Sequence, residues 1–305
     1  MIVCGRISVK KTSNRRYKFS NLANDDLAGP LKTPSQSNLS LRVLSGAILL
    51  PAAVGLVWIG GMPFALVIAL VTGGMCVEWT RMSRLGARSY VSWVAAAFAV
   101  AAVLSLQFGQ FGWVGSTAVI ILIGAVTLWG LSKFENIEDS VLTAISLPYV
   151  ACGGASMVWI RNGDENGFDI VILLLSIVVA MDIGAYAVGR TVGGPKMAPR
   201  ISPGKTWSGL FGGAICAGGV GVIASVFFEL GPVILSALAG SLLGLLAQIG
   251  DLVESALKRR YGAKDSGTII PGHGGLLDRF DGFLTVFPAA GFILWVQNGS
   301  STSWL

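Results

Sequence analysis

Long apolar stretches separated by short polar segments make up most of this 305-residue chain. The stretches approach the roughly 20 residues that a helix needs to cross the hydrocarbon core of a bilayer. They lack the apolar and polar alternation of membrane β-barrel strands. Because a bilayer offers the backbone no water to bond with, the pattern predicts an all-α, polytopic membrane bundle of about nine transmembrane helices. The expected spans are 43–61, 62–79, 91–108, 112–131, 140–160, 169–189, 207–228, 231–250 and 280–297.

Composition supports this class. The chain is 53% hydrophobic and only 12% charged, and its mean hydropathy is +0.71. The first two spans are separated only by GGMP, so one re-entrant unit is an alternative to two crossings there. The four cysteines are scattered without a CxxC pair, which predicts neither a zinc site nor a disulfide framework.

The positive charges predict the orientation. If the N-terminus is cytosolic, 21 of the 22 Lys and Arg residues fall in the segments expected inside, and only Arg161 falls outside. The positive-inside rule therefore places the N-terminus in the cytosol, and we expect the inner (plasma) membrane of a bacterium. The net charge of +6 reflects topology and contact with anionic lipid. No basic strip with interleaved aromatic residues is present, so nucleic acid is not an expected partner.

Two segments are too rich in charge and glycine to be simple connectors. We expect residues 1–42 to form a polar, basic, disordered cytosolic tail, and 43–298 to form one transmembrane domain. Within that domain, the segments 182–209 and 250–282 lie on the same expected side of the membrane. They are predicted to form one cytosol-facing polar active site.

Carboxylates in these segments suit a hard cation. Asp251, with Glu254, Ser255 and Lys258, follows i, i+3, i+4 and i+7 spacing, which puts all four on one face of a helix continuing out of span eight. A helix that merely solvates itself at the interface explains this group equally well. Asp278 and Asp281 repeat the i, i+3 spacing at the membrane edge, and Asp182 lies inside span six, where an acid is costly unless it is used. Several carboxylates with little sulfur or imidazole predict Mg²⁺.

The same segments also suit phosphate. GGPK, SPGK and PGHGG are glycine-rich turns whose N–H groups can approach an anion, and His273 lies within the last of them. SPGKT lacks the first glycine of a P-loop, so a nucleotide-hydrolysing P-loop is not expected. Phosphoryl or nucleotidyl transfer to a lipid fits the combined site. The basic residues that add charge to it are Lys205, Lys258, Arg259, Lys264 and Arg279.

Residues 255–281, SALKRRYGAKDSGTIIPGHGGLLDRFD, match without a miss the diagnostic pattern of a known family. The chain resembles the phosphatidate cytidylyltransferases, or CDP-diacylglycerol synthases. The upstream DIGAYAVGR and ISPGKTWSG are also similar to that family, although Ser208 stands where the family commonly has glutamate. The resemblance implies that CTP and phosphatidate react to give CDP-diacylglycerol and pyrophosphate.

The resemblance also implies residue roles. Asp251, Asp278 and Asp281 would be carboxylates of the metal centre, with Asp182 as a further candidate ligand. Asp251, Asp278 and Asp281 would be catalytic together with Lys258. Substrate binding would fall to Ser202, Lys205, Ser255, Arg259, Lys264, Asp265, His273 and Arg279. The family likeness further implies a two-cation centre of Mg²⁺ with K⁺, and a homodimer.

Two alternatives stay open. A related CTP-dependent transferase acting on another membrane lipid phosphate would carry the same cytosolic motifs and differ only in its acyl-facing groove. A secondary transporter would place its polar groups near the midplane and often repeat its halves. Here the ionisable residues gather at the cytosolic edge, and the sequence contains no such repeat.

Overall fold

The computed structural model describes residues 51–83, 90–108, 113–135, 137, 139–163, 165–228, 232–267 and 274–296. The expected tail, residues 43–50 of the expected first span and His273 lie outside these residues. Seven described helices are long and apolar enough to cross a membrane. The prediction of an all-α, polytopic membrane bundle is confirmed.

The helices are α2 (Gly61–Met82), α3 (Tyr90–Phe108), α4 (Trp113–Phe134), α5 (Ser140–Gly163), α6 (Gly167–Thr191), α7 (Trp207–Phe228), α8 (Val233–Arg260), α9 (Leu277–Phe280) and α10 (Phe283–Val296). Residues 51–59 are also helical. Two strands, β1 (Lys196–Ala198) and β2 (Ser202–Thr206), lie between α6 and α7.

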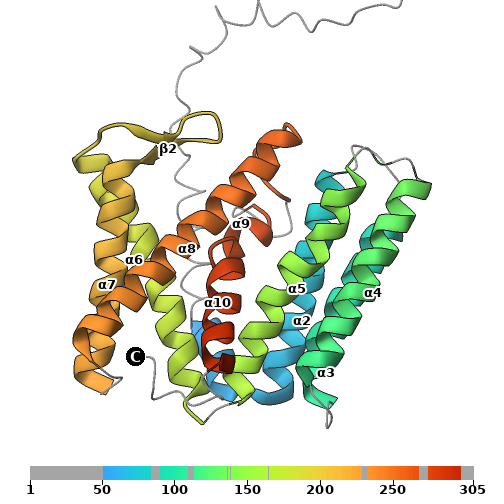
Figure 1. Cartoon of the computed structure of the whole chain (residues 1–305), viewed down its shortest axis with the longest axis horizontal. Helices are drawn as coiled ribbons and strands as arrows, with labels where there is room; N and C mark the ends of the chain where they lie inside the picture. Colours follow the sequence, from blue (N-terminus) through green and yellow to red (C-terminus); the bar gives the residue numbers. More distant parts are fainter. Residues whose placement is uncertain are drawn as a thin grey trace, which may run out of the picture.

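The helices form two groups joined by α10. Helices α2 to α5 pack on one another, and α6, α7 and α8 form the second group. Helix α10 packs against both α5 and α8, so it lies between the groups (Figure 1). The seven long helices are apolar nearly all round, as expected for helices that face protein on one side and lipid on the other.

Small residues let the second group pack closely. A Cβ on Gly213 of α7 would lie 2.6 Å from the Met181 carbonyl oxygen of α6. A Cβ on Gly240 of α8 would lie 2.6 Å from the carbonyl oxygen of Ala217 in α7. Both distances are too short for a side chain, so glycine is needed at these crossings, as is common where membrane helices approach backbone to backbone.

Helix α8 is longer than the expected span 231–250. Its 28 residues correspond to about 42 Å, whereas the hydrocarbon core is about 30 Å thick. The helix therefore continues beyond one crossing length, and Figure 1 shows it running obliquely from α7 towards α9. The sequence prediction of a helix that continues past span eight is confirmed.

Helix α10 is shorter than the expected span 280–297. It has 14 residues, or about 21 Å. It begins after Gly282, whose N–H donates to the Oδ1 atom of Asp281 (2.7 Å) instead of extending a helix from α9. The expected span thus divides between α9, a short connection and α10.

A β-hairpin that the hydrophobic pattern did not predict precedes α7. The strands β1 and β2 are antiparallel, with Lys196 opposite Thr206 and Ala198 opposite Ser202. Positive φ values at Gly193 (66°) and Gly194 (107°) turn the chain between α6 and β1. The hairpin, the C-terminal end of α8 and α9 lie at the same end of the bundle (Figure 1). This arrangement brings the two motif-rich segments into one region.

Candidate active site

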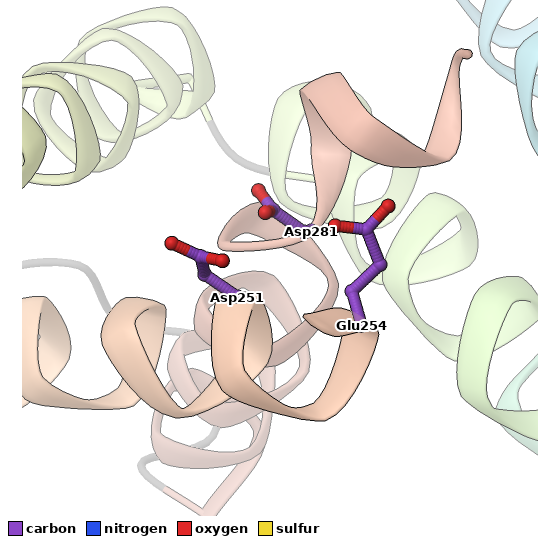
Figure 2. Close-up of side chains that lie close together, drawn as sticks. All are labelled: Asp251, Glu254 and Asp281. Atoms are coloured by element: carbon purple, nitrogen blue, oxygen red, sulfur yellow. The ribbon is translucent and has the colours of Figure 1, made fainter. Parts of the chain in front are cut away.

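Three carboxylates meet where α8 passes the connection between α9 and α10. Asp251 and Glu254 project from α8, and Asp281 comes from the connection (Figure 2). One oxygen of each lies within 4.8 Å of the others. A Cβ on Gly250 would overlap the Asp281 carbonyl oxygen and lie 2.8 Å from Thr285 Oγ1, so glycine permits this close approach.

The chemistry of this carboxylate cluster fits a hard cation. Glu254 is only 2% exposed, and its Oε1 atom has no hydrogen-bond partner among the described residues. A buried carboxylate oxygen without a donor is costly unless a cation or water satisfies it. Carboxylate oxygens in a small group are the ligands that Mg²⁺ and related ions prefer. The three residues therefore offer a suitable place for such an ion.

Asp281 belongs to the connection between α9 and α10, outside the seven helices that are long enough to cross a membrane. Burial and the nearby carboxylate of Asp251 raise the pKa of Asp281 to about 7, and the carboxylate of Asp182 acts in the same direction. Like charges this close favour a shared positive partner. The electrostatics thus agree with the geometry of the carboxylate cluster.

Lys258 joins the carboxylate cluster to α9. Its Nζ atom lies 3.0 Å from Glu254 Oε2 and 2.7 Å from Asp278 Oδ1. The backbone N–H groups of Gly275 (2.9 Å) and Ser266 (3.0 Å) donate to Asp278 Oδ2. Both oxygens of Asp278 are therefore occupied by protein donors.

Burial alone would raise the pKa of Asp278. The neighbouring side chains of Glu254 and Lys258 and the N–H groups of Gly275 and Ser266 outweigh that effect and hold the pKa well below its usual range. Asp278 is thus held as an anion by the turn that precedes it and by Lys258.

The predicted ligand set and the observed group differ. Asp251 and Asp281 were predicted, and the structure brings them together with Glu254, which the sequence placed on the same helix face but not in the ligand set. Asp278 instead lies beside Lys258. Glu254 joins the carboxylate cluster because it lies one helical turn from Asp251 on the same face of α8.

The hairpin reaches the carboxylate cluster through Lys205. Its Nζ atom lies 2.6 Å from Asp251 Oδ2, and Ser255 Oγ donates to Asp251 Oδ1 (3.3 Å). The Nε of Arg259 donates to the Ile201 carbonyl oxygen at the start of β2 (3.2 Å). The two segments that the sequence predicted to form one site are therefore in direct contact.

Asp182 lies on the same side of α6 as Val178, which lies close to the connection between α9 and α10. A Cβ on Gly282 would lie 3.2 Å from Val178 Cγ1, and Asp182 follows Val178 by one helical turn. Its carboxylate acts electrostatically on Asp281. Asp182 therefore borders the carboxylate cluster without belonging to the group of three.

The other predicted residues lie around the cluster. Ser202 is half-buried in the hairpin, whereas Arg259, Lys264, Asp265 and Arg279 are exposed. Ser208, at the position where glutamate was expected, donates to the Gly193 carbonyl oxygen and shares a hydrogen bond with Thr206 (3.1 Å). In this chain Ser208 therefore links the turn before β1 to the end of β2.

Glu78 of α2 is a participant that the sequence analysis missed. It is buried, and it accepts hydrogen bonds from the backbone N–H groups of Leu276 (3.0 Å) and Leu277 (2.9 Å). The available signal was an acid within an otherwise apolar stretch, the same signal that singled out Asp182. Glu78 lies one residue before the expected end of span two, at residue 79.

Together these features define a polytopic membrane protein with a carboxylate cluster and two lysines at one end of its helical bundle. Residues 40–297 match the Cytidylyltransferase family, and the chain belongs to that family. The resemblance inferred from the two motifs is confirmed.

Three relatives illustrate the likeness. The phosphatidate cytidylyltransferase of Brucella suis biovar 1 is 38% identical over 252 residues, covering 81% of this chain and 90% of the relative. That of Bacillus subtilis is 34% identical over 266 residues, covering 84% and 98%. That of Staphylococcus epidermidis is 32% identical over 264 residues, covering 84% and 99%.

Proposed function

We propose that this chain is a phosphatidate cytidylyltransferase, which converts CTP and phosphatidate into CDP-diacylglycerol and pyrophosphate. The observation that carries the proposal is the likeness, over more than four-fifths of the chain, to relatives that bear this name. The geometry agrees, because carboxylates and lysines gather at one end of a membrane bundle. A nucleotide from the aqueous phase and a lipid headgroup can both reach such a place.

The reaction is a substitution at phosphorus. A phosphate oxygen of phosphatidate attacks the α-phosphorus of CTP and forms a new P–O–P bond. The bond from that phosphorus to the oxygen bridging to the β-phosphorus breaks, and its electron pair leaves with pyrophosphate. The nucleophile is already anionic, so catalysis consists mainly of positioning and charge stabilisation.

Asp251, Glu254 and Asp281 would hold a divalent cation, which we propose is Mg²⁺. When bound, the ion supplies positive charge to the triphosphate and to the leaving pyrophosphate. Asp182 borders this place and would orient an ion-bound water or a substrate hydroxyl. K⁺ as a second cation and a homodimer stay predictions from the family likeness.

The basic residues would bring two anionic substrates together. Lys258 and Lys205 lie directly beside the carboxylate cluster, so each could contact a phosphate while remaining near its present carboxylate partner. Arg259, Lys264 and Arg279 are exposed around it and would attract the triphosphate from solution. Ser202, Ser255, Asp265 and His273 are proposed to complete the contacts to nucleotide and lipid.

The orientation proposed for the chain places this end of the bundle in the cytosol. The support is the positive-inside pattern, because nearly all Lys and Arg residues fall in segments expected at that end. CTP is a cytosolic nucleotide, so the orientation and the reaction are consistent. We propose the bacterial inner membrane as the location.

A reconstituted assay tests the proposal. Purified full-length protein in mixed micelles receives CTP labelled at the α-phosphorus, phosphatidate and Mg²⁺. The expected result is CDP-diacylglycerol and pyrophosphate in equal amounts, lost when EDTA is added. Label transfer to a polyprenyl phosphate but not to phosphatidate would replace this proposal with the alternative lipid acceptor.

A further inference from the structure

Glu78 connects the first helical group to the candidate active site. It belongs to α2, close to the C-terminal end of the helix, and only 3% of its surface is exposed. A buried carboxylate is costly unless hydrogen-bond donors compensate it. The span itself has no need for an acid at this position. The contacts of Glu78 therefore indicate why it is there.

Both oxygens of Glu78 are used by the turn at the start of α9. The N–H of Leu276 donates to Oε1 (3.0 Å), and the N–H of Leu277 donates to Oε2 (2.9 Å). The hydroxyl of Ser266 also donates to Oε2 (3.3 Å). These donors lie almost 200 residues from Glu78 in the sequence, so the contacts bind one region of the chain to another.

Asp278 binds the neighbouring groups of the same turn. It accepts the N–H groups of Gly275 (2.9 Å) and Ser266 (3.0 Å), and its own N–H donates to Ser266 Oγ (3.3 Å). Ser266 therefore contacts both carboxylates. Through Asp278 and Lys258, the turn held by Glu78 is linked to the carboxylate cluster.

Two glycines make room for Glu78. A Cβ on Gly275 would lie 2.7 Å from Glu78 Oε2, and a Cβ on Gly267 would lie 2.7 Å from Glu78 Cδ. The backbone can approach the carboxylate only because these positions lack side chains. Gly275 belongs to the PGHGG turn that the sequence analysis assigned to phosphate, and Gly267 belongs to the diagnostic pattern 255–281. In the structure both accommodate a carboxylate of the protein.

We propose that Glu78 is a positioning residue, which holds α9 so that Asp278 and Asp281 keep their places beside α8. Helix α9 has only four residues and cannot be stable by itself, because a helix this short does not offset the cost of its own nucleation. Contacts with other parts of the chain must therefore fix the orientation of α9. The inference rests on the proposed function only for its effect on turnover, since the effect on α9 is independent of the reaction.

The test compares Glu78→Gln with wild-type full-length protein in detergent micelles. Glutamine keeps the size of the side chain but offers one acceptor oxygen in place of two, and its NH₂ group would face N–H donors. Hydrogen–deuterium exchange of peptides covering residues 274–282 is measured first. We expect faster exchange there and unchanged exchange in α3, α4 and α7.

Kinetics of the same samples give the second readout. A shift of about 1 Å in a reacting group can cost about 10²-fold in rate, so we expect kcat to fall by about that factor. KM for CTP is expected to change by less than about threefold, because the lost effect concerns the reacting geometry rather than ground-state binding. Glu135→Gln is the matched control. Glu135 directly follows α4, a helix that lies apart from α9 in Figure 1, and it accepts a hydrogen bond from the Tyr90 hydroxyl (2.6 Å), so its change should affect neither readout.

The outcomes separate cleanly. Unchanged exchange in 274–282 overturns the inference, as does faster exchange spread over all helices, which would make Glu78 a general packing residue. Faster exchange confined to residues 274–282 together with an unchanged kcat also overturns the inference. Should Glu78→Gln fail to fold, Ser266→Ala keeps the carboxylate, removes one donor and is expected to give the same local exchange with a smaller loss of kcat. A wild-type protein without activity would overturn the proposed function and leave the exchange comparison as the test of Glu78.

Discussion

The helical group α2–α5 and the group α6–α8 differ in how they use polar residues. The second group, with α9, carries most of the charged residues of the candidate site, and they contact one another: Lys205 with Asp251, and Lys258 with Glu254 and Asp278. The first group is largely apolar packing and contributes the buried Glu78. Under the proposed function, the second group would provide the chemistry and the first group would provide its support.

The largest effect is expected from removing a carboxylate of the cluster. Asp281→Asn should lower turnover by at least about 100-fold, or roughly 2.7 kcal/mol in barrier, because the cluster would lose one of the three carboxylates proposed to hold the cation. Membrane abundance should not change. The matched control is Asp139→Asn, which removes a half-buried carboxylate paired with the exposed Arg260 at the same end of the bundle and should leave turnover within about twofold. Equal losses in both variants would erase the distinction between the two groups.

Removing Lys258 should have a somewhat smaller effect on turnover but a clear effect on stability. Lys258→Met leaves Glu254 and Asp278 without their shared cationic partner. Breaking a buried ion pair commonly costs about 3–5 kcal/mol of folding free energy. We expect a smaller cost here because the lysine is only partly buried. We expect about 10-fold to 100-fold slower turnover together with a lower melting temperature in detergent. A variant with full activity at unchanged melting temperature would show that the link between α8 and α9 is dispensable.

Close packing at Gly250 gives a sharper test of geometry. Gly250→Ala adds a methyl group that overlaps the Asp281 carbonyl oxygen, so the connection before α10 must move away from α8. We expect about a tenfold loss of turnover, or roughly 1.4 kcal/mol in barrier. Gly219→Ala in α7 is the matched control, because a Cβ there meets nothing within 4 Å. Similar losses from both alanines would indicate that helix flexibility, rather than the position of Asp281, limits the rate.

The smallest effect is expected at the N-terminus. The family match begins at residue 40, and the preceding residues are polar without a helical period. Deleting residues 1–39 should leave specific activity within about twofold, or under roughly 0.5 kcal/mol in barrier. The measurement is specific activity at equal membrane abundance. A larger loss would show that the tail belongs to the catalytic machinery.

The helical fold could be predicted from the sequence because lipid imposes a simple rule. A backbone without water must bond to itself, so each apolar stretch of sufficient length becomes a helix. The same rule could not predict where α10 begins or that a hairpin forms, since both depend on local contacts. The hydrogen bond from Gly282 to Asp281 and the strand pairing of Lys196 with Thr206 carry no hydrophobic signal.

The site could be predicted only in part. The motifs singled out Asp251, Asp278 and Asp281 as carboxylates of the site and Lys205 and Lys258 among its basic residues. The structure brings Asp251 and Asp281 together, with both lysines nearby. The spacing could not show which oxygens are already satisfied. Asp278 is occupied by Lys258 and backbone donors, whereas Glu254 keeps a buried oxygen without a partner among the described residues. Glu78 escaped prediction because its partners, Leu276 and Leu277, are distant in sequence and bind through their backbones.

The most direct test of the carboxylate cluster is Mn²⁺ binding measured by electron paramagnetic resonance, with Mn²⁺ as the probe for the divalent cation. Wild type, Glu254→Gln and Asp278→Asn are titrated in detergent micelles in the presence of CTP. We predict that Glu254→Gln weakens Mn²⁺ binding by more than about tenfold, roughly 1.4 kcal/mol, while Asp278→Asn weakens it by less than about threefold. Retained binding in Glu254→Gln with lost binding in Asp278→Asn would contradict the assignment of the cation to Asp251, Glu254 and Asp281.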